Sequence, residues 1–71
     1  MKKYLIIIEK TDGGFSAYSP DLEGCIASGS SREEVEKNMQ EAIAFHLEGL
    51  QEEGYEIPQP KSYSKYVNIS A

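Results

Sequence analysis

Few side chains in this chain of 71 residues have the chemistry that catalysis requires. The single cysteine, Cys25, and the single histidine, His46, could in principle act as a nucleophile and its base. Such a pair needs a third residue that orients the base, and no residue is marked for that role. Because an unpaired cysteine is commonly a small buried apolar residue, we interpret Cys25 as structural. We predict no catalytic residue and do not expect an enzyme.

The carboxylates and glycines also lack the spacing of metal or cofactor sites. Asp12, Asp21 and the glutamates further along the chain do not follow the alternating ligand pattern of a calcium-binding loop. A zinc site needs several ligands, and His46 has no second histidine to join it. Gly13 and Gly14 lack the spacing of a phosphate-binding loop. We therefore predict no metal and no cofactor, and we interpret His46 as a core or interface histidine.

A long amphipathic helix is the element around which the rest of the chain must be organised. Ser31 and Glu34 have the spacing of a capping box, and Gly54 can end a helix in the left-handed conformation. At 100° per residue the apolar side chains between them cover an arc of about 140°, which is typical of a face packed on a core. We predict a helix from about Arg32 to Glu53. Its apolar face comprises Val35, Met39, Ala42, Ile43, His46, Leu47 and Leu50.

The remaining segments have the patterns of strands. The Asp12-Gly13-Gly14 turn predicts a hairpin, because these residues readily adopt the positive φ of tight turns. We predict strands at about Lys3 to Lys10, Phe15 to Ser19, Cys25 to Ser28 and Tyr63 to Ile69. The order is β-β-β-α-β, so the expected fold is α+β, with an antiparallel sheet packed on one long helix. Residues 1–71 form a single domain in this interpretation.

Composition excludes several classes of function. The net charge of −5 argues against direct nucleic-acid binding, which depends on cationic neutralisation of phosphates. The apolar run from Tyr4 to Ile8 is too short for a secretory signal or a membrane span. One cysteine excludes an internal disulfide, which fits the reducing cytoplasm. A domain this small buries a limited share of its surface, so we expect a homodimer or a tetramer.

An imbalance of charge marks the helix region. Residues 32–56 carry eight acidic and two basic side chains. Negative charge favours the start of a helix, but Glu48 and Glu52 lie near its end and repel each other four residues apart. Such a face can be merely solvated, or it can be complementary to a basic protein. For the second case we predict as partner-binding residues Asp21, Glu23, Glu41, Glu48 and Glu52.

Several short motifs together resemble the HicB family of antitoxins from bacterial toxin–antitoxin systems. Two positions depart from the usual family pattern: Glu23 stands where proline is common, and Val35 where alanine is common. The resemblance runs through nearly the whole chain. The motifs are YSPDLEGCIASG from Tyr18 to Gly29, Ser31-Arg32-Glu33-Glu34, Asn38, Glu41-Ala42-Ile43 and Ile57-Pro58-Gln59-Pro60.

The resemblance implies a degraded ribonuclease-H-like fold that has lost its catalytic carboxylates. It also implies a partner, a small basic HicA-type toxin that cleaves mRNA and whose active-site histidine the antitoxin covers. Many members of the family carry a C-terminal DNA-binding domain, which we do not expect here. The alternative is a stand-alone oligomeric binding module that has the same fold and no toxin partner.

Overall fold

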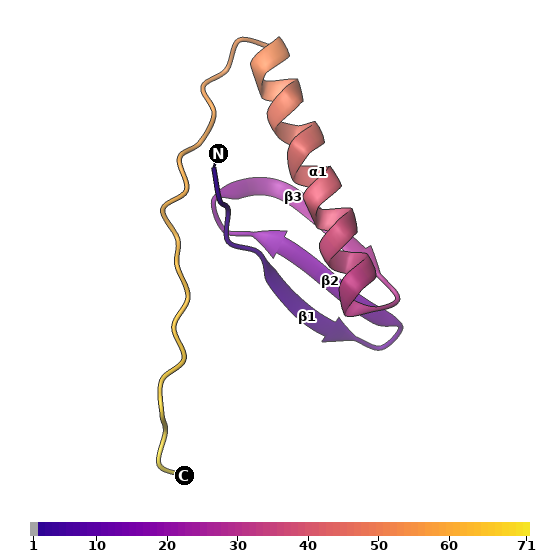
Figure 1. Ribbon diagram of the computed structural model, residues 1–71, viewed down its shortest axis with the longest axis vertical. Coiled ribbons are helices and arrows are strands. Elements are labelled where there is room, and N and C mark those ends of the chain that lie inside the picture. The colour runs from indigo at the N-terminus through magenta and orange to yellow at the C-terminus, as the bar shows by residue number, and fades with distance from the viewer. Residues whose placement is uncertain (1) are drawn as a thin grey trace.

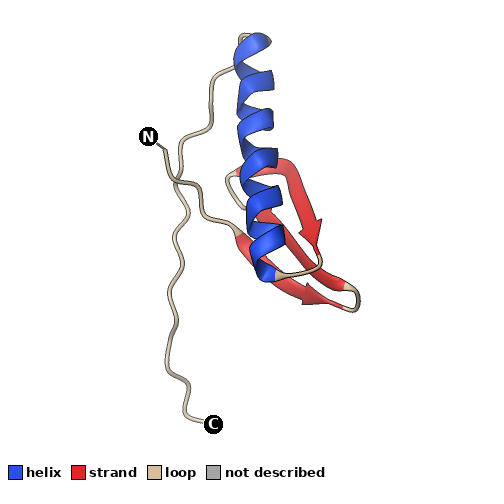
Figure 2. Cartoon of the chain, turned by 45° about the vertical axis from the view of Figure 1, so that its right-hand side comes forward, coloured by secondary structure: helices blue, strands red, loops and turns tan. Residues whose placement is uncertain are grey.

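The computed structural model describes residues 2–71 and has the expected α+β architecture. Within those residues an antiparallel sheet of three strands is followed by one helix (Figure 1). The elements are β1 (Ile7–Thr11), β2 (Gly14–Ser19), β3 (Leu22–Gly29) and α1 (Arg32–Glu52). The strands lie in the order β1-β2-β3, and α1 crosses one face of this sheet (Figure 2). The predicted fold class is confirmed.

Two tight turns set the register of the sheet. The predicted hairpin forms at Asp12 and Gly13, so that Thr11 pairs with Gly14 and Ile7 with Tyr18. The second turn, between β2 and β3, consists of Pro20 and Asp21 alone, because Ser19 pairs with Leu22. The predicted strands left a longer turn, from Pro20 to Gly24. β3 therefore begins three residues before the predicted Cys25.

β1 begins later than predicted, at Ile7 and not at Lys3. Continuing the register beyond the pair of Ile7 and Tyr18 would bring Leu5 opposite Pro20, which has no N–H to donate. The ladder therefore ends near Ile7, and residues 3–6 extend beyond it without a partner strand among residues 2–71.

The signals at the two ends of α1 act as predicted. The Ser31 hydroxyl accepts a hydrogen bond from the Glu34 N–H at 3.1 Å. The Glu34 carboxylate reaches back to accept from the Ser30 N–H at 2.7 Å, one residue earlier than in an ideal capping box. At the other end Gly54 has a φ of 78°, and the Tyr55 N–H donates to the Leu50 carbonyl at 2.9 Å.

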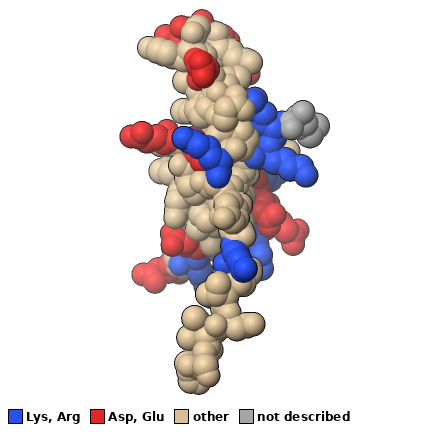
Figure 3. Space-filling view, turned by 90° about the vertical axis from the view of Figure 1, so that its left-hand side faces the viewer, with Lys and Arg blue, Asp and Glu red and all other residues tan. Residues whose placement is uncertain are grey.

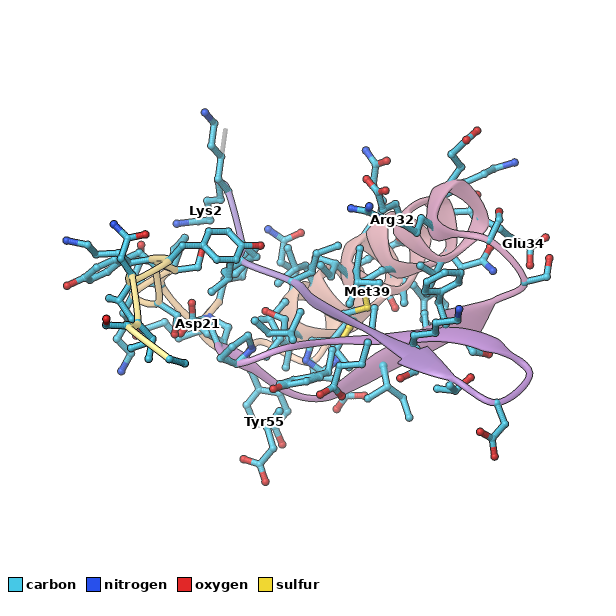
Figure 4. The ribbon with its side chains drawn as sticks, turned by 90° about the horizontal axis from the view of Figure 1, so that it is seen from below. Lys2, Asp21, Arg32, Glu34, Met39 and Tyr55 are labelled. Carbon is cyan, nitrogen blue, oxygen red and sulfur yellow. The ribbon has the colours of Figure 1, made fainter. Side chains whose placement is uncertain are left out.

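The core lies between α1 and the sheet. Val35 and Met39 project from the helix and are completely buried, and Figure 4 shows Met39 between the two layers. Ala17, Leu22 and Cys25 bury their side chains from the strands beneath. Burial raises the pKa of the Cys25 thiol, because the thiolate would lose its solvation. Cys25 thus has the structural role that was predicted for it.

The predicted fourth strand, Tyr63 to Ile69, is wrong for the single chain. Residues 55–71 are extended but contain no strand, and they run down one side of the molecule past the sheet (Figure 1). A strand exists only where its backbone finds a partner, and no backbone hydrogen bond joins this segment to the sheet within residues 2–71. Residues 63–69 therefore have the alternating pattern of a strand but no hydrogen-bonded partner strand among residues 2–71.

The first prediction concerns the contact between the end of β3 and the first turn of α1. A methyl group on Gly29 would lie 2.6 Å from the Val35 nitrogen, which is backbone and cannot move aside. Gly29→Ala should therefore destabilise the protein by about 1 to 3 kcal/mol or more. That is a large part of the roughly 4 to 10 kcal/mol expected for a domain of this size. Urea unfolding followed by circular dichroism measures the change.

Gly13→Ala is the matched control, because a methyl group there would meet nothing within 4 Å and Gly13 does not have positive φ. Equal stability of the two variants would contradict the proposed contact.

Candidate partner-binding surfaces

The outer side of α1 carries an acidic helix face, which we define as Glu41, Phe45, Glu48 and Glu52. At 100° per residue these four positions fall within an arc of about 60°, on the side of the helix opposite to the middle of its apolar face. All four side chains are exposed. Within residues 2–71 none of the three carboxylates accepts a hydrogen bond from another side chain. The helix therefore presents three free carboxylates in one row.

Phe45 was missed as a site residue in the sequence analysis. Its ring is 79% exposed, although it stands four residues after Glu41 and three before Glu48 on the same face. The signal that could have identified it is this position, since a phenylalanine on the polar side of an amphipathic helix has no core to enter. An exposed ring with a charged rim has the composition of an interface anchor.

Negative charge is concentrated at the end of α1. Its last turn has no basic residue, and the carbonyls there add the negative end of the helix dipole to Glu48 and Glu52. Figure 3 shows acidic side chains without basic ones at the top of the molecule, where the helix ends, whereas acidic and basic side chains are mixed lower down. A surface of this kind attracts and orients a cationic partner.

The structure places Glu23 apart from the acidic helix face. Glu23 is exposed at the start of β3, on the rim of an open groove of about 680 Å³. His46 is half-buried and also lines this groove, which agrees with its predicted place in the core or at an interface. The groove lies on the sheet side of α1, and the residues lining it are Glu23, Gly24, His46, Leu50, Tyr55, Glu56 and Pro58.

Asp21 is used inside the molecule. Its Oδ2 atom accepts hydrogen bonds from the N–H groups of Lys61 and Ser62, each at 3.0 Å, and its Oδ1 atom accepts from the Ser62 hydroxyl at 2.9 Å. These donors, the Ser62 N–H above all, hold the pKa of Asp21 below its ordinary value. Asp21 thus ties the chain after the helix to the turn between β2 and β3 (Figure 4). Its predicted contact with a partner stays a prediction.

Two classes of site were also searched for in residues 2–71. No group of three or more His, Cys, Asp or Glu side chains is arranged to hold a metal ion. The one helix in these residues is not apolar enough to cross a membrane.

Comparison with known proteins identifies relatives along nearly the whole chain. Residues 4–70 match the model of a family described as HicB-like antitoxins of bacterial toxin–antitoxin systems. An uncharacterized 14.9 kDa protein from the rep-hol intergenic region of Haemophilus phage HP1 is 38% identical over 65 residues, which are 92% of this chain and 49% of that protein. A UPF0150 protein of Synechocystis sp. is 36% identical over 67 residues, which are 93% of this chain and 85% of that protein.

Two solved structures with the same fold contain the antitoxin HicB3. A chain in the HicA3 and HicB3 toxin–antitoxin complex is 43% identical and superimposes with a TM-score of 0.72, over 83% of this chain and 70% of that one. The antitoxin HicB3 is 44% identical with a TM-score of 0.69, over 80% of this chain and 42% of its own. The chain therefore spans about half the length of the phage protein and less than half of HicB3.

The second prediction follows from the bonds of Asp21. Because its pKa is lowered in the folded state, the ionised carboxylate holds residues 61 and 62 fully at pH above the ordinary value of 3.8. This contribution is lost as the pH falls through the lower folded value. The protection of the Lys61 and Ser62 amide protons, measured as the ratio of the intrinsic to the observed exchange rate at each pH, should therefore fall, and their NMR signals should shift, as the pH falls below about 4.

Asp21→Asn should produce the same fast exchange at neutral pH, whereas Asp12→Asn in the hairpin turn should not. Slow exchange of both amides in Asp21→Asn would refute the anchoring role.

Proposed function

The chain belongs to the family of HicB-like antitoxins of bacterial toxin–antitoxin systems, and we propose that it acts as an antitoxin that binds a HicA-type ribonuclease. Binding covers the active site of the toxin, so the inhibitor supplies bulk and contacts and performs no chemistry. The observation that carries the proposal is the acidic helix face, a row of free carboxylates around an exposed phenyl ring. The similarity to the HicA3–HicB3 complex supports the same conclusion.

The carboxylates contribute to the rate at which the partners meet. Glu41, Glu48 and Glu52 are exposed, so each ion pair with the toxin would be screened by solvent and salt and would add little free energy. Their summed field nevertheless steers a basic protein toward the end of α1. An incoming cationic surface also relieves the repulsion between Glu48 and Glu52, which costs the free helix about 0.2 to 0.5 kcal/mol.

Phe45 contributes to how long the complex lasts. Since 79% of its surface is exposed in the free chain, nearly the whole ring is left to be buried by a partner. Complete burial of a phenylalanine side chain contributes about 1.5 to 3 kcal/mol. This is more than the rim charges supply, so the ring anchors the complex and the carboxylates orient it.

Glu23 would contact the toxin at a second place, which Asp21 supports from within the molecule. Glu23 lies on the rim of the groove at the sheet side of α1, where Tyr55 and His46 offer further contacts. Asp21 is occupied by Lys61 and Ser62, and so it acts by fixing the course of the chain beside that groove. Because the proposed partner cleaves mRNA, both proteins meet in the cytoplasm.

The third prediction separates steering from anchoring. Reversing Glu48 and Glu52 together to Lys should slow association with a HicA-type toxin about tenfold or more at low salt, and should flatten the dependence of the association rate on ionic strength. The fold should persist, because neither side chain points inward. Stopped-flow or biolayer measurements across a salt series give the rates.

Reversing Glu9 and Asp12 to Lys is the control, since it makes the same change of charge on the first hairpin. If this control slows association and the helix variant does not, the toxin meets the sheet and not α1. If no toxin of this class binds the unaltered chain, the proposed function is wrong and the chain is a binding module of another kind.

The fourth prediction tests the anchor. Phe45→Ala should leave the association rate nearly unchanged and raise the dissociation rate about 10- to 100-fold, because the contact forms after the partners meet. Its stability should match the unaltered protein, since the ring is exposed. Ile26→Ala is the control, as its side chain is 72% exposed on the sheet. An unchanged dissociation rate in Phe45→Ala would remove the ring from the interface.

A further inference from the structure

The C-terminal tail, which we define as residues 63–69, is a strand in pattern that has no partner in its own chain. Its large apolar side chains are exposed, with Tyr63 at 88%, Tyr66 at 100%, Val67 at 66% and Ile69 at 76%. Within residues 2–71 no hydrogen bond joins the tail to the rest of the molecule. So much exposed apolar surface in one segment is typical of a surface that another chain covers.

Residues 58–62, which we call the root of the tail, are nevertheless held by hydrogen bonds to the rest of the chain. The Tyr4 hydroxyl donates to the Pro58 carbonyl at 2.6 Å, and the Lys2 ammonium donates to the Gln59 side chain at 3.0 Å. Asp21 then holds Lys61 and Ser62. The chain is therefore directed past the sheet before the tail begins, which lowers the entropy that binding of the tail would cost.

The edge of the sheet at β1 is open to accept a strand. β1 and β3 are the two edge strands, but α1 leans over the β3 side, where the Asn38 amide donates to the Ser28 carbonyl at 2.8 Å. Beyond the start of β1, Leu5 and Ile6 continue in extended form with no partner strand among residues 2–71. Residues 5–8 along this edge are uncharged and apolar, unlike Glu9 and Lys10 further along β1, and an edge of that composition readily pairs with another strand.

A gap separates the tail from β1 of its own chain. Residues 64–66 and residues 5–8 together line an open space of about 290 Å³, and no backbone hydrogen bond joins the two segments within residues 2–71. Because Tyr4 and Asp21 hold residues 58, 61 and 62, the tail runs alongside the sheet without pairing with this edge (Figure 1). Each copy thus offers an unpaired strand and an unpaired edge at the same time.

Charge indicates which partner takes the tail. Residues 57–71 carry two lysines and no acidic residue, whereas residues 1–56 carry five basic and twelve acidic ones. Residues 57–71 therefore have a formal charge of +2, and residues 1–56 have a formal charge of −7. A basic toxin would repel this segment, but the acidic body of a second copy attracts it.

We propose that two copies of this chain exchange their tails, each tail pairing with the β1 edge of the other copy as its fourth strand. The exchange is two-fold symmetric, so both tails and both edges become paired in one closed assembly. It buries the tyrosines of the tail and covers the open edge. This inference does not depend on toxin binding, which we place on α1.

The first experiment is sedimentation of the full chain at micromolar concentration. The unaltered chain should have twice its mass of 7.9 kDa. Successive N–H groups of a strand point to opposite sides, so either Val67→Pro or Asn68→Pro must remove a donor of the ladder. The variant that does so should raise the dissociation constant of the dimer by tenfold or more. Ala71→Pro, beyond the tail, is the control.

The body of these proline variants should stay folded by circular dichroism, since the tail has no bond to it. A monomeric unaltered chain, or a dimer that both prolines leave intact, would overturn the proposal.

The second experiment distinguishes exchange from closure onto the same chain. Ile7→Cys and Lys65→Cys introduce thiols at positions that line the gap. Mixing the two single variants under mild oxidation should give a covalent dimer that joins position 7 to position 65, because exchange brings these residues of different copies together. The buried Cys25 serves as the control, since the unaltered chain should give no such dimer. If mixing gives no cross-link and the double variant forms an internal one, the tail closes onto its own chain.

Discussion

The fold depends on the close approach of the first turn of α1 to the last residue of β3. Gly29 has no side chain, and the Val35 backbone occupies the space where one would be. This contact, together with the cap formed by Ser31 and Glu34, sets the angle at which the helix crosses the sheet. Met39 is thereby brought down onto Leu22 and Cys25 in the core. A core this small leaves little margin, so one added methyl group at the contact matters more than it would in a larger domain.

That geometry also decides what the rest of the surface can do. With the apolar side of α1 committed to the core, the row of Glu41, Glu48 and Glu52 must face solvent, and Phe45 is carried out with it. Stability is not served by this arrangement, because like charges repel and an exposed ring gains nothing in the free chain. Such features are consistent with binding to a cationic partner, which an antitoxin of this family would meet. The groove lined by Glu23 and His46 lies on the other side of the same helix end.

The position of α1 leaves the sheet asymmetric. The helix leans over β3, where Asn38 caps a free carbonyl, and leaves the β1 edge open. The Asp21 carboxylate holds Lys61 and Ser62, and so it aligns the chain that follows the helix beside that edge. The domain thus contains the parts of a larger sheet, held close together but unpaired. Completion of the sheet by a second copy would use surface away from the acidic helix face, where we propose that a toxin binds.

The sequence by itself determined the elements whose causes are local. Asp12 and Gly13 specify a hairpin through their backbone preferences, and Ser31 and Gly54 specify the ends of α1, because each signal acts within a few residues. The family was also readable from short motifs. The strand bounds were less accurate, since Leu22 joins β3 only because Ser19 lies opposite it.

Only the tertiary structure decided which segments meet. The alternation from Tyr63 to Ile69 is that of a strand, yet a strand requires a partner. Which partner it can reach depends on where Tyr4 and Asp21 hold residues 58, 61 and 62, which lie 40 to 54 residues further along the sequence. For the same reason, only the structure reveals that Asp21 anchors the chain after the helix. Burial and pairing are properties of distant residues brought together, and no local pattern contains them.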